Sequence, residues 1–336
     1  MGSRLPWTVM NPNAETPAPR SLPRLHRAVV EWYGREARDL PWRAPDRTPW
    51  GVLVSEIMLQ QTPVVRVLPV WTRWLQRWPE PTDLAAASPA DVVRAWDRLG
   101  YPRRALRLHA AAQRIRDIHG GRVPEDHAEL LALPGIGAYT AAAVAVFAFG
   151  QRHTVVDTNI RRAHARLFTG HALPARSLTA AENRLAEAVM PEDVAGSVAW
   201  NQAVMELGAL VCTARAPRCG QCPVRDECAW VAAGSPPAAE KPRGQSWQGT
   251  DRQVRGAVMA VLRAAQDPVP RPLLLTDLAG SEQLAAGHSA PPDVVVERLG
   301  ALWRLDAPTE QRERALAGLL ADGLAAEEPA GIRLPG

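Results

Sequence analysis

The sequence predicts an all-α fold over roughly its first 230 residues, followed by a smaller C-terminal part. Three observations support this fold class. Apolar residues recur at helical spacing in one segment after another, and no alternation typical of strands is convincing before residue 250. Helix signals separate these segments, such as the Ser-Pro-Ala-Asp start at residues 88–91 and the Gly-Gly stop at residues 120–121. The most apolar stretch, residues 138–149, has the length of a buried core helix.

Length and composition limit the function classes. The chain has 336 residues, which is enough for two or three domains that each bury a hydrophobic core. Its formal net charge is +4 and its sequence pI is about 9.2, a basic balance that permits a polyanionic partner such as nucleic acid. The sequence has neither an apolar run of about eighteen residues nor a signal-peptide pattern, so we expect a cytoplasmic protein without a membrane partner.

The N-terminal part begins irregularly and continues into two helices. Residues 1–22 are rich in proline and show little periodicity, which predicts a disordered leader. A helix is expected over residues 25–38, and a mostly buried helix over residues 51–62 follows the motif LPWR. Glu56 lies in the middle of this second helix. Because carboxylates are rarely buried unless they are paired or used, Glu56 either faces the surface or has a function.

Helical patterns continue as far as the cysteine-containing segment. The helix expected over residues 103–119 places Arg103, Arg107 and Arg114 on one face, which either is solvated or contacts phosphates. Further helices are expected over residues 64–78, 89–99, 125–132, 157–168, 178–190 and 193–211.

Residues 133–162 form the stretch around which the rest of the chain is organised. They open with the turn Leu-Pro-Gly-Ile-Gly, enter an apolar helix and end on Asp157 after a short hydrophobic run. Gly135 and Gly137 permit backbone angles that a side chain would forbid. Such a turn at a helix start directs N–H groups outward, where a DNA backbone phosphate could bind. Taken alone, the same turn is also typical of an ordinary connection between packed helices.

The cysteines indicate a metal site. Their spacing is C-x6-C-x2-C-x5-C, at Cys212, Cys219, Cys222 and Cys228. Four thiolates in one short loop can hold a [4Fe–4S] cluster. Zinc is the alternative, but structural zinc sites usually pair two C-x2-C knuckles across a longer gap, and only one such knuckle is present. The spacing therefore favours iron–sulfur, with a structural role for the cluster in a basic loop that can press on phosphate.

The C-terminal part differs from the helical array before it. Residues 234–249 are rich in glycine and proline, which is typical of a linker. Helices are expected over residues 251–265, 271–279 and 308–322, and a hairpin over residues 324–334. This order suggests a small winged-helix-like module over residues 250–336, which either binds duplex DNA or caps the core.

Together these motifs resemble a known family. In chain order they are LPWR, SEIMLQQT, LGY, LPGIGAYTA, VVDTNIRR, NQAVMELGALVC and the cysteine spacing. They are similar, over about residues 25–232, to the MutY-type adenine DNA glycosylases of the helix-hairpin-helix glycosylase superfamily. The resemblance implies a catalytic domain over residues 23–233, with two helical subdomains that grip DNA and a target base flipped between them. It also implies a [4Fe–4S] cofactor and a substrate of double-stranded DNA with adenine opposite 8-oxoguanine or guanine, and we expect a monomer.

The resemblance assigns two acids to different tasks. Cleavage of a purine N-glycosidic bond needs an acid for the departing base and an anion for the oxocarbenium-like sugar. Glu56 matches the family acid that protonates adenine N7, and burial would raise its pKa. Asp157 matches the aspartate that stabilises the sugar cation, and the adjacent helix start should keep it ionised. Relatives that resemble endonuclease III carry a lysine nucleophile in place of Tyr139, so the resemblance implies a monofunctional enzyme in which Tyr139 and Asn159 position the sugar and water.

Other positions match the family's contacts to the flipped base and to the duplex. The base-pocket positions are Trp42, Arg43 and Gln202, and the duplex contacts are Gln60, Gln61, Thr62, Tyr101, Gly135 and Gly137. The Gln60–Gln61 segment would enter the duplex near the lesion, and Tyr101 would wedge into the base stack. A purely structural role stays open for Trp42, Gln202 and Tyr101.

The chain also departs from the family pattern. The family often has Tyr-Tyr where this chain has Tyr101-Pro102, and its C-terminal Nudix-like domain carries a Phe-Ser-His loop. Here His288-Ser289 stands without the preceding phenylalanine, so the way in which the opposite base is recognised stays open. Two alternatives to adenine removal follow. One is a mismatch glycosylase of another specificity, such as thymine from T·G pairs, and the other is a non-catalytic or redox-sensing DNA-binding protein, against which the two acids argue.

Overall fold

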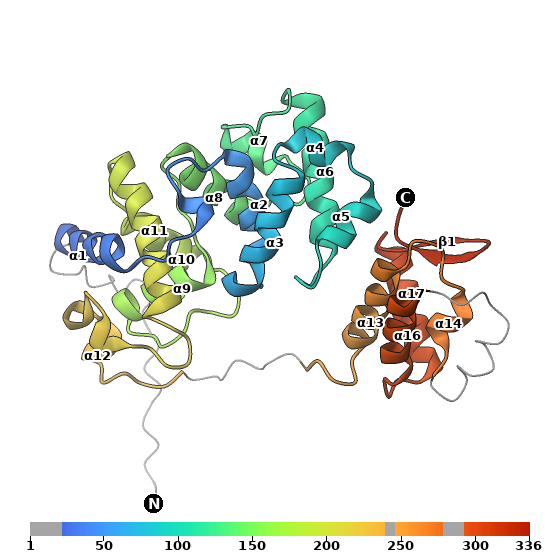
Figure 1. Ribbon diagram of the computed structural model, residues 1–336. Coiled ribbons are helices and arrows are strands. Elements are labelled where there is room, and N and C mark those ends of the chain that lie inside the picture. The colour runs from blue at the N-terminus through green and yellow to red at the C-terminus, as the bar shows by residue number, and fades with distance from the viewer. Residues whose placement is uncertain (1–21, 239–245, 278–291) are drawn as a thin grey trace, which may run out of the picture. The chain divides into compact units, whose positions relative to one another are not determined.

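A computed structural model of the chain describes residues 22–238, 246–277 and 292–336 (Figure 1). Nearly all of the expected leader, and the His288-Ser289 loop, lie outside these residues. The chain divides into two compact units. The first unit combines Met1–Ala44 with Ala145–Lys241, and the second combines Pro45–Val144 with Pro242–Gly336. Within the described ranges, no helix combines the length and the apolar character needed to cross a membrane.

The first unit is built around α11, Val194–Leu210, which is capped at its start by Asp193. Helices α1, Leu22–Glu36, and α9, Thr158–His164, both pack against α11. The helix expected over residues 157–168 is divided, because α9 passes into the single π-helical turn η2. The other elements are η1 Pro41–Arg43, η2 Ala165–Thr169, α10 Ala180–Ala188, η3 Cys219–Gln221, η4 Arg225–Glu227 and α12 Ala229–Ala232.

The second unit contains most of the remaining helices of the predicted array. Ser88 caps α5 as expected, with its side chain accepting from the Asp91 N–H. Helix α4 was not expected from the sequence, although Glu80 and Asp83 form a capping box at its start. The elements are α2 Pro49–Leu59, α3 Val64–Arg77, α4 Pro81–Ala86, α5 Pro89–Ala95, α6 Arg103–Ile118, α7 His127–Leu131 and α8 Ala138–Phe149, which ends in the first unit.

The C-terminal module belongs to the second unit and continues its hydrophobic core. The module consists of α13 Asp251–Ala264, α14 Arg271–Leu275, α16 Asp293–Trp303, α17 Thr309–Ala321 and the strands β1 Ala326–Glu328 and β2 Gly331–Arg333. The strands form the expected antiparallel hairpin, and Val269 adds an isolated bridge to Ile332. Helix α16 was not expected. Buried apolar residues of the module pack in one cluster with Ala90 and Val93 of α5. The module is therefore held against α5 by its hydrophobic core as well as by the linker.

Candidate functional site

The turn before α8 confirms one of the two glycine expectations. Gly135 has a φ of +77°, and a Cβ placed on it would lie 2.7 Å from the Cβ of Arg107 on α6. A side chain is therefore excluded at this position by both backbone and space. Gly137 differs, because its φ is not positive and a Cβ there would meet no atom within 4 Å. The expectation of a forbidden backbone angle is wrong for Gly137, where the missing side chain leaves open space instead.

Glu56 is buried at the centre of α2 and is paired with the first turn of α8. Residues 50–58 are all buried, because α2 is apolar on every side, and the Glu56 residue is only 6% exposed. Tyr139 Oη donates a hydrogen bond of 2.8 Å to Glu56 Oε2. The surface-facing alternative for Glu56 is thereby excluded. Two sequence-predicted site residues that are 83 positions apart thus meet within the second unit.

Asp157 is the N-cap of α9 in the first unit, and both of its carboxylate oxygens accept hydrogen bonds. The Ile160 N–H donates to Oδ1 over 2.6 Å, and Asn159 Nδ2 donates to Oδ2 over 2.8 Å. Burial raises the pKa of Asp157, whereas these hydrogen bonds and the nearby Arg162 act in the opposite direction. The helix start therefore has to offset a desolvation effect that the sequence did not indicate.

Arg162 connects this carboxylate to the cysteine-containing loop. Its side chain is buried, and its Nη2 donates to Asn159 Oδ1 over 2.8 Å and to the Gly208 carbonyl over 2.7 Å. Its Nε donates to the Cys212 carbonyl over 2.7 Å. A continuous hydrogen-bonded chain therefore runs from the Asp157 carboxylate through Asn159 and Arg162 to the backbone of the first cysteine. The position of the Asp157 carboxylate is thus coupled to the fold of the loop.

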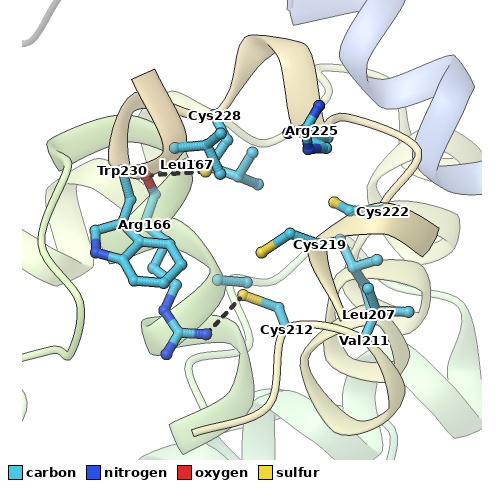
Figure 2. A pocket seen from close by; sticks show the side chains of 12 residues that line it. Arg166, Leu167, Leu207, Val211, Cys212, Cys219, Cys222, Arg225, Cys228 and Trp230 are labelled. Carbon is cyan, nitrogen blue, oxygen red and sulfur yellow. Dashed lines mark hydrogen bonds between the residues drawn. The ribbon is translucent and has the colours of Figure 1, made fainter. Parts of the chain in front are cut away.

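The four cysteines are free thiols that line one hollow in the first unit, of about 390 Å³ including space open to solvent. Figure 2 shows all four side chains turned toward this shared space. Leu167, Leu207, Val211 and Trp230 supply much of the remaining lining, together with arginine side chains.

The donor set and the surroundings of the hollow fit an iron–sulfur cluster. Burial raises the pKa of the Cys222 thiol to about 12, and the neighbouring thiols add to this effect, so positive metal charge is what would hold these sulfurs as thiolates. Arg166 Nη1 donates to Cys212 Sγ over 3.3 Å, and the Arg166 guanidinium lies 4.7 Å from the ring centroid of Trp230. A hydrogen bond to a ligand sulfur and an apolar wall are features that tune and shield such clusters.

Glu206 is a residue that the sequence reasoning missed. It is fully buried on α11, and it accepts from Arg38 Nε over 2.7 Å and from Arg43 Nη2 over 2.9 Å. Burial alone would raise the pKa of Glu206, but the hydrogen bonds from the two arginines lower it to about 2. An acid in the middle of the apolar motif NQAVMELGALVC was the available signal, as it was for Glu56.

The predicted base-pocket residues lie in the first unit around this ion pair. Arg43 is held by Glu206, and its guanidinium lies 5.8 Å from the ring centroid of Tyr33. Trp42 is buried on the same 3-10 turn, and Gln202 is half-buried on α11, one turn before Glu206.

Arg104, also missed, joins the two loops predicted to contact the duplex. Its Nη1 donates to the Gln60 carbonyl over 2.6 Å, and its Nη2 donates to Thr62 Oγ1 and to the Gly100 carbonyl, each over 3.0 Å. Gln61 and Tyr101, one in each loop, have positive φ values of 56° and 46°. Because left-handed backbone is costly for such residues, the buried Arg104 side chain holds both loops in strained conformations.

The structure thus brings the predicted residues together in groups within each unit. Glu56 and Tyr139 meet in the second unit, where Gln60 Nε2 also donates to Thr140 Oγ1 over 3.3 Å. Asp157 and Asn159 meet in the first unit. The approach of Glu56 to Asp157 stays a prediction.

The chain is similar in sequence to known DNA repair proteins. Residues 54–188 match the family model described as HhH-GPD superfamily base excision DNA repair protein, and residues 212–228 match the iron-sulfur binding domain of endonuclease III. The chain is 47% identical over 310 residues to the adenine DNA glycosylase of Mycobacterium tuberculosis, covering 92% of both chains. It is 42% identical over 215 residues to that of Homo sapiens, covering 60% of this chain and 38% of the human one.

Two solved structures also resemble the chain. The structure of a thermostable thymine-DNA glycosylase matches with a TM-score of 0.55 at 26% identity, covering 63% of this chain and 97% of that one. A non-covalent complex of endonuclease III with DNA matches with a TM-score of 0.54 at 22% identity, covering 64% and 98%, which supports the fold alone.

Proposed function

The chain belongs to the adenine DNA glycosylases of the HhH-GPD superfamily of base excision DNA repair proteins, and from this premise we propose that it hydrolyses the N-glycosidic bond of adenine mispaired with 8-oxoguanine or guanine in double-stranded DNA. The observation that supports the site assignment best is the hydrogen bond from Tyr139 Oη to the buried Glu56 Oε2. It places a carboxyl group at the start of the helix that follows the Pro-Gly-x-Gly turn.

Glu56 acts in this mechanism as the general acid. Its apolar surroundings on α2 disfavour the charged form, and Tyr139 fixes one carboxyl oxygen so that the other can carry the proton. The proton passes to N7 of adenine. The electron pair of the C1′–N9 bond then leaves with the base, and the sugar becomes oxocarbenium-like.

Asp157 stabilises the sugar cation by its negative charge. Hydrogen bonds from the Ile160 N–H and from Asn159 Nδ2 fix its carboxylate, so it is oriented before charge develops on the sugar. A water molecule then bonds through its oxygen to C1′, and its proton goes to the Glu56 carboxylate, which has given its own proton to adenine.

The enzyme is proposed to be monofunctional because Tyr139 replaces a lysine nucleophile. A phenol cannot form a Schiff base with C1′, so the chemistry stops at an abasic site. Strand breaks that appear without alkali would contradict this assignment. A Glu56→Gln variant should bind the A·8-oxoG duplex and fail to release adenine, and retained turnover would exclude Glu56 as the acid.

DNA contacts are proposed at the turn and at the two loops joined by Arg104. The open space at Gly137 suits close approach of a phosphate to the N–H groups at the start of α8. Gln60, Gln61 and Thr62 in one loop and Tyr101 in the other would enter the distorted duplex. The base pocket would be lined by Trp42, Arg43 and Gln202.

The four cysteines would hold a [4Fe–4S] cluster, which would cross-link the loop and fix its fold. The loop residues Arg215, Arg218 and Arg225 are proposed to press on the phosphate backbone. Arg162 donates to the Cys212 carbonyl of the loop and to Asn159, and Asn159 in turn donates to Asp157, so the fold of the loop would help to position Asp157.

A duplex panel tests the base specificity. Duplexes with A·8-oxoG, A·G and T·G pairs are incubated with the full chain and then treated with alkali. Alkali-labile sites at adenine support the proposal, whereas cleavage at T·G with adenine left intact would favour the thymine alternative that one solved relative suggests.

Three further expectations are proposed with this function. The catalytic domain spans residues 23–233, and the part after the linker at residues 234–249 is a winged-helix-like module. This second proposal is supported by helices α13, α14, α16 and α17 followed by a hairpin. The protein acts as a monomer in the cytoplasm, which light scattering and cell fractionation would check.

A further inference from the structure

Two exposed aromatic side chains lie close to one guanidinium group in the second unit. Tyr101 is 42% exposed and Trp247 is 51% exposed, and they are the exposed aromatic residues among the described part of the chain. The Arg252 guanidinium lies 5.4 Å from the ring centroid of Tyr101 and 5.3 Å from that of Trp247. Tyr101 precedes α6, whereas Trp247 lies at the end of the linker and Arg252 lies in the first turn of α13, at the start of the C-terminal module.

The position of Arg252 relative to Tyr101 is fixed by the docked module. Besides the shared apolar cluster, Arg94 Nη2 donates to the Ala265 carbonyl over 3.0 Å, and Arg263 Nε donates to the Val93 carbonyl over 3.1 Å. Arg103 is exposed, in line with the expected solvated face, and it also pairs with Asp322 over 3.0 Å. The C-terminal end of α13 and Asp322 at the end of α17 are therefore held against the α5–α6 region.

Tyr101 is also held from its own side. Its positive φ follows a second left-handed residue, Gly100 at φ +81°, whose carbonyl accepts from Arg104 Nη2. The Arg104 guanidinium lies 5.8 Å from the centroid of the Tyr101 ring. A strained backbone that presents an exposed ring, rather than burying it, indicates a use for the ring outside the fold.

We infer that Trp247, Arg252 and Tyr101 form one stacking surface for an unstacked base of the bound duplex, so that the C-terminal module contributes directly to DNA binding. Every base presents a π-face to an aromatic ring or to a guanidinium plane, and the positive charge of Arg252 favours the polyanion. An unstacked base must exist once the target adenine leaves the helix, so this inference rests on the proposed function.

Packing within the module is the competing explanation for Trp247. A Cβ placed on Gly256 would lie 3.3 Å from the Trp247 ring, so this tryptophan also covers part of α13. Packing alone predicts an effect of Trp247 on thermal stability and none on DNA affinity. Stacking on a base predicts a loss of DNA affinity as well, because half of Trp247 is exposed.

The test measures binding and cleavage separately with the cluster-loaded full chain. Affinity is measured on an A·8-oxoG duplex whose target nucleoside carries a 2′-fluorine to block cleavage, and the single-turnover rate is measured on the cleavable duplex at saturating enzyme. Trp247→Ala and Arg252→Ala should each weaken binding by about fivefold to a hundredfold, the range for loss of one base–aromatic contact. The saturated rate should change by less than about twofold.

Matched variants separate stacking from other roles. Trp247→Phe should restore most of the affinity, and Arg252→Lys should not, because an ammonium group has no planar face. Val296→Ala and Arg314→Ala alter exposed residues of the same module and should leave affinity unchanged. Affinity of Trp247→Ala within twofold of the parent, or full rescue by Arg252→Lys, would overturn the inference. Failure of the parent to cut the cleavable duplex would instead contradict the proposed function.

Discussion

The hydrogen-bonded chain from Asp157 to Cys212 makes a quantitative prediction for Arg162→Lys. Arg162 donates from its three side-chain nitrogens to four acceptors, namely Asn159 Oδ1 and the carbonyls of Thr158, Gly208 and Cys212. An ammonium group keeps the charge but cannot reproduce this planar fork. We expect Asn159 Oδ1 to lose its partner, and the Asn159 amide to hold Asp157 Oδ2 less firmly.

The magnitude follows from the single hydrogen bond that is loosened. A hydrogen bond to a charged group is worth about 1.5–3 kcal/mol. If the transition state loses the lower part of this range, the single-turnover rate falls about tenfold. Asn159→Ala removes the donor to Asp157 directly and should slow the reaction by about tenfold to a hundredfold. Because Arg162 acts through Asn159, the double variant should be no slower than Asn159→Ala.

The assay is adenine release at saturating enzyme, with iron content and thermal unfolding measured on the same samples. Iron content must stay at the parent level for the comparison to hold. Arg161→Lys is the matched control, because the neighbouring Arg161 pairs with Glu182 and is not part of the hydrogen-bonded chain from Asp157 to Cys212. A double variant whose loss equals the product of the two single losses would refute the reasoning, as would a parental rate in Arg162→Lys.

Four other predictions follow from the same geometry. Gly135→Ala should lower the free energy of unfolding by at least about 1 kcal/mol, because the positive φ and the nearby Arg107 side chain both exclude a side chain there. Gly137→Ala should fold normally and bind duplex DNA more weakly. Equal unfolding curves for the two variants would contradict this prediction. Glu206→Gln should lower the free energy of unfolding at pH 7 by up to about 3 kcal/mol, since the pKa of Glu206 falls from 4.5 to about 2. A depressed pKa gives stability that is present above pH 4.5 and lost as the pH falls towards 2, so denaturant curves of parent and variant should converge in that window. The pKa of Asp157 is raised and its charged form is needed, so the single-turnover rate should fall with decreasing pH at values above 3.8, and a flat profile down to that pH would count against its role. Cys222→Ser should abolish the absorbance of the cluster near about 400 nm and destabilise the loop, and an unchanged spectrum would exclude this ligand.

The sequence predicted the order of most helices because their signals are local. Ser88 and the residues after it form a cap whose geometry depends on four positions, and the cysteine spacing is set by one loop. Helix α4 had a similar local signal, in Glu80 and Asp83, that was not used. Helix α16 was also missed, although Pro292 and Asp293 at its start were an available signal.

The partners of the site residues could not be predicted, because they depend on packing between distant segments. Glu56 and Tyr139 were identified as separate positions, but their hydrogen bond requires α2 to meet α8. Arg104 and Arg162 resemble solvated surface residues in the sequence, yet both are buried and each donates to several backbone carbonyls. An arginine next to a functional motif can therefore be a buried structural donor, just as an acid inside an apolar helix can be a buried site residue.

The apolar seam between α5 and the C-terminal module affects how shortened chains would behave. A chain ended before residue 246 would uncover Ala90 and Val93, together with the Val93 carbonyl that now accepts a hydrogen bond from Arg263. Self-association of such a fragment would then result from the uncovered apolar residues of α5 and would not represent the behaviour of the full chain. A chain nicked between residues 238 and 246 should instead stay together as two pieces, and the C-terminal piece added separately should restore the missing cover.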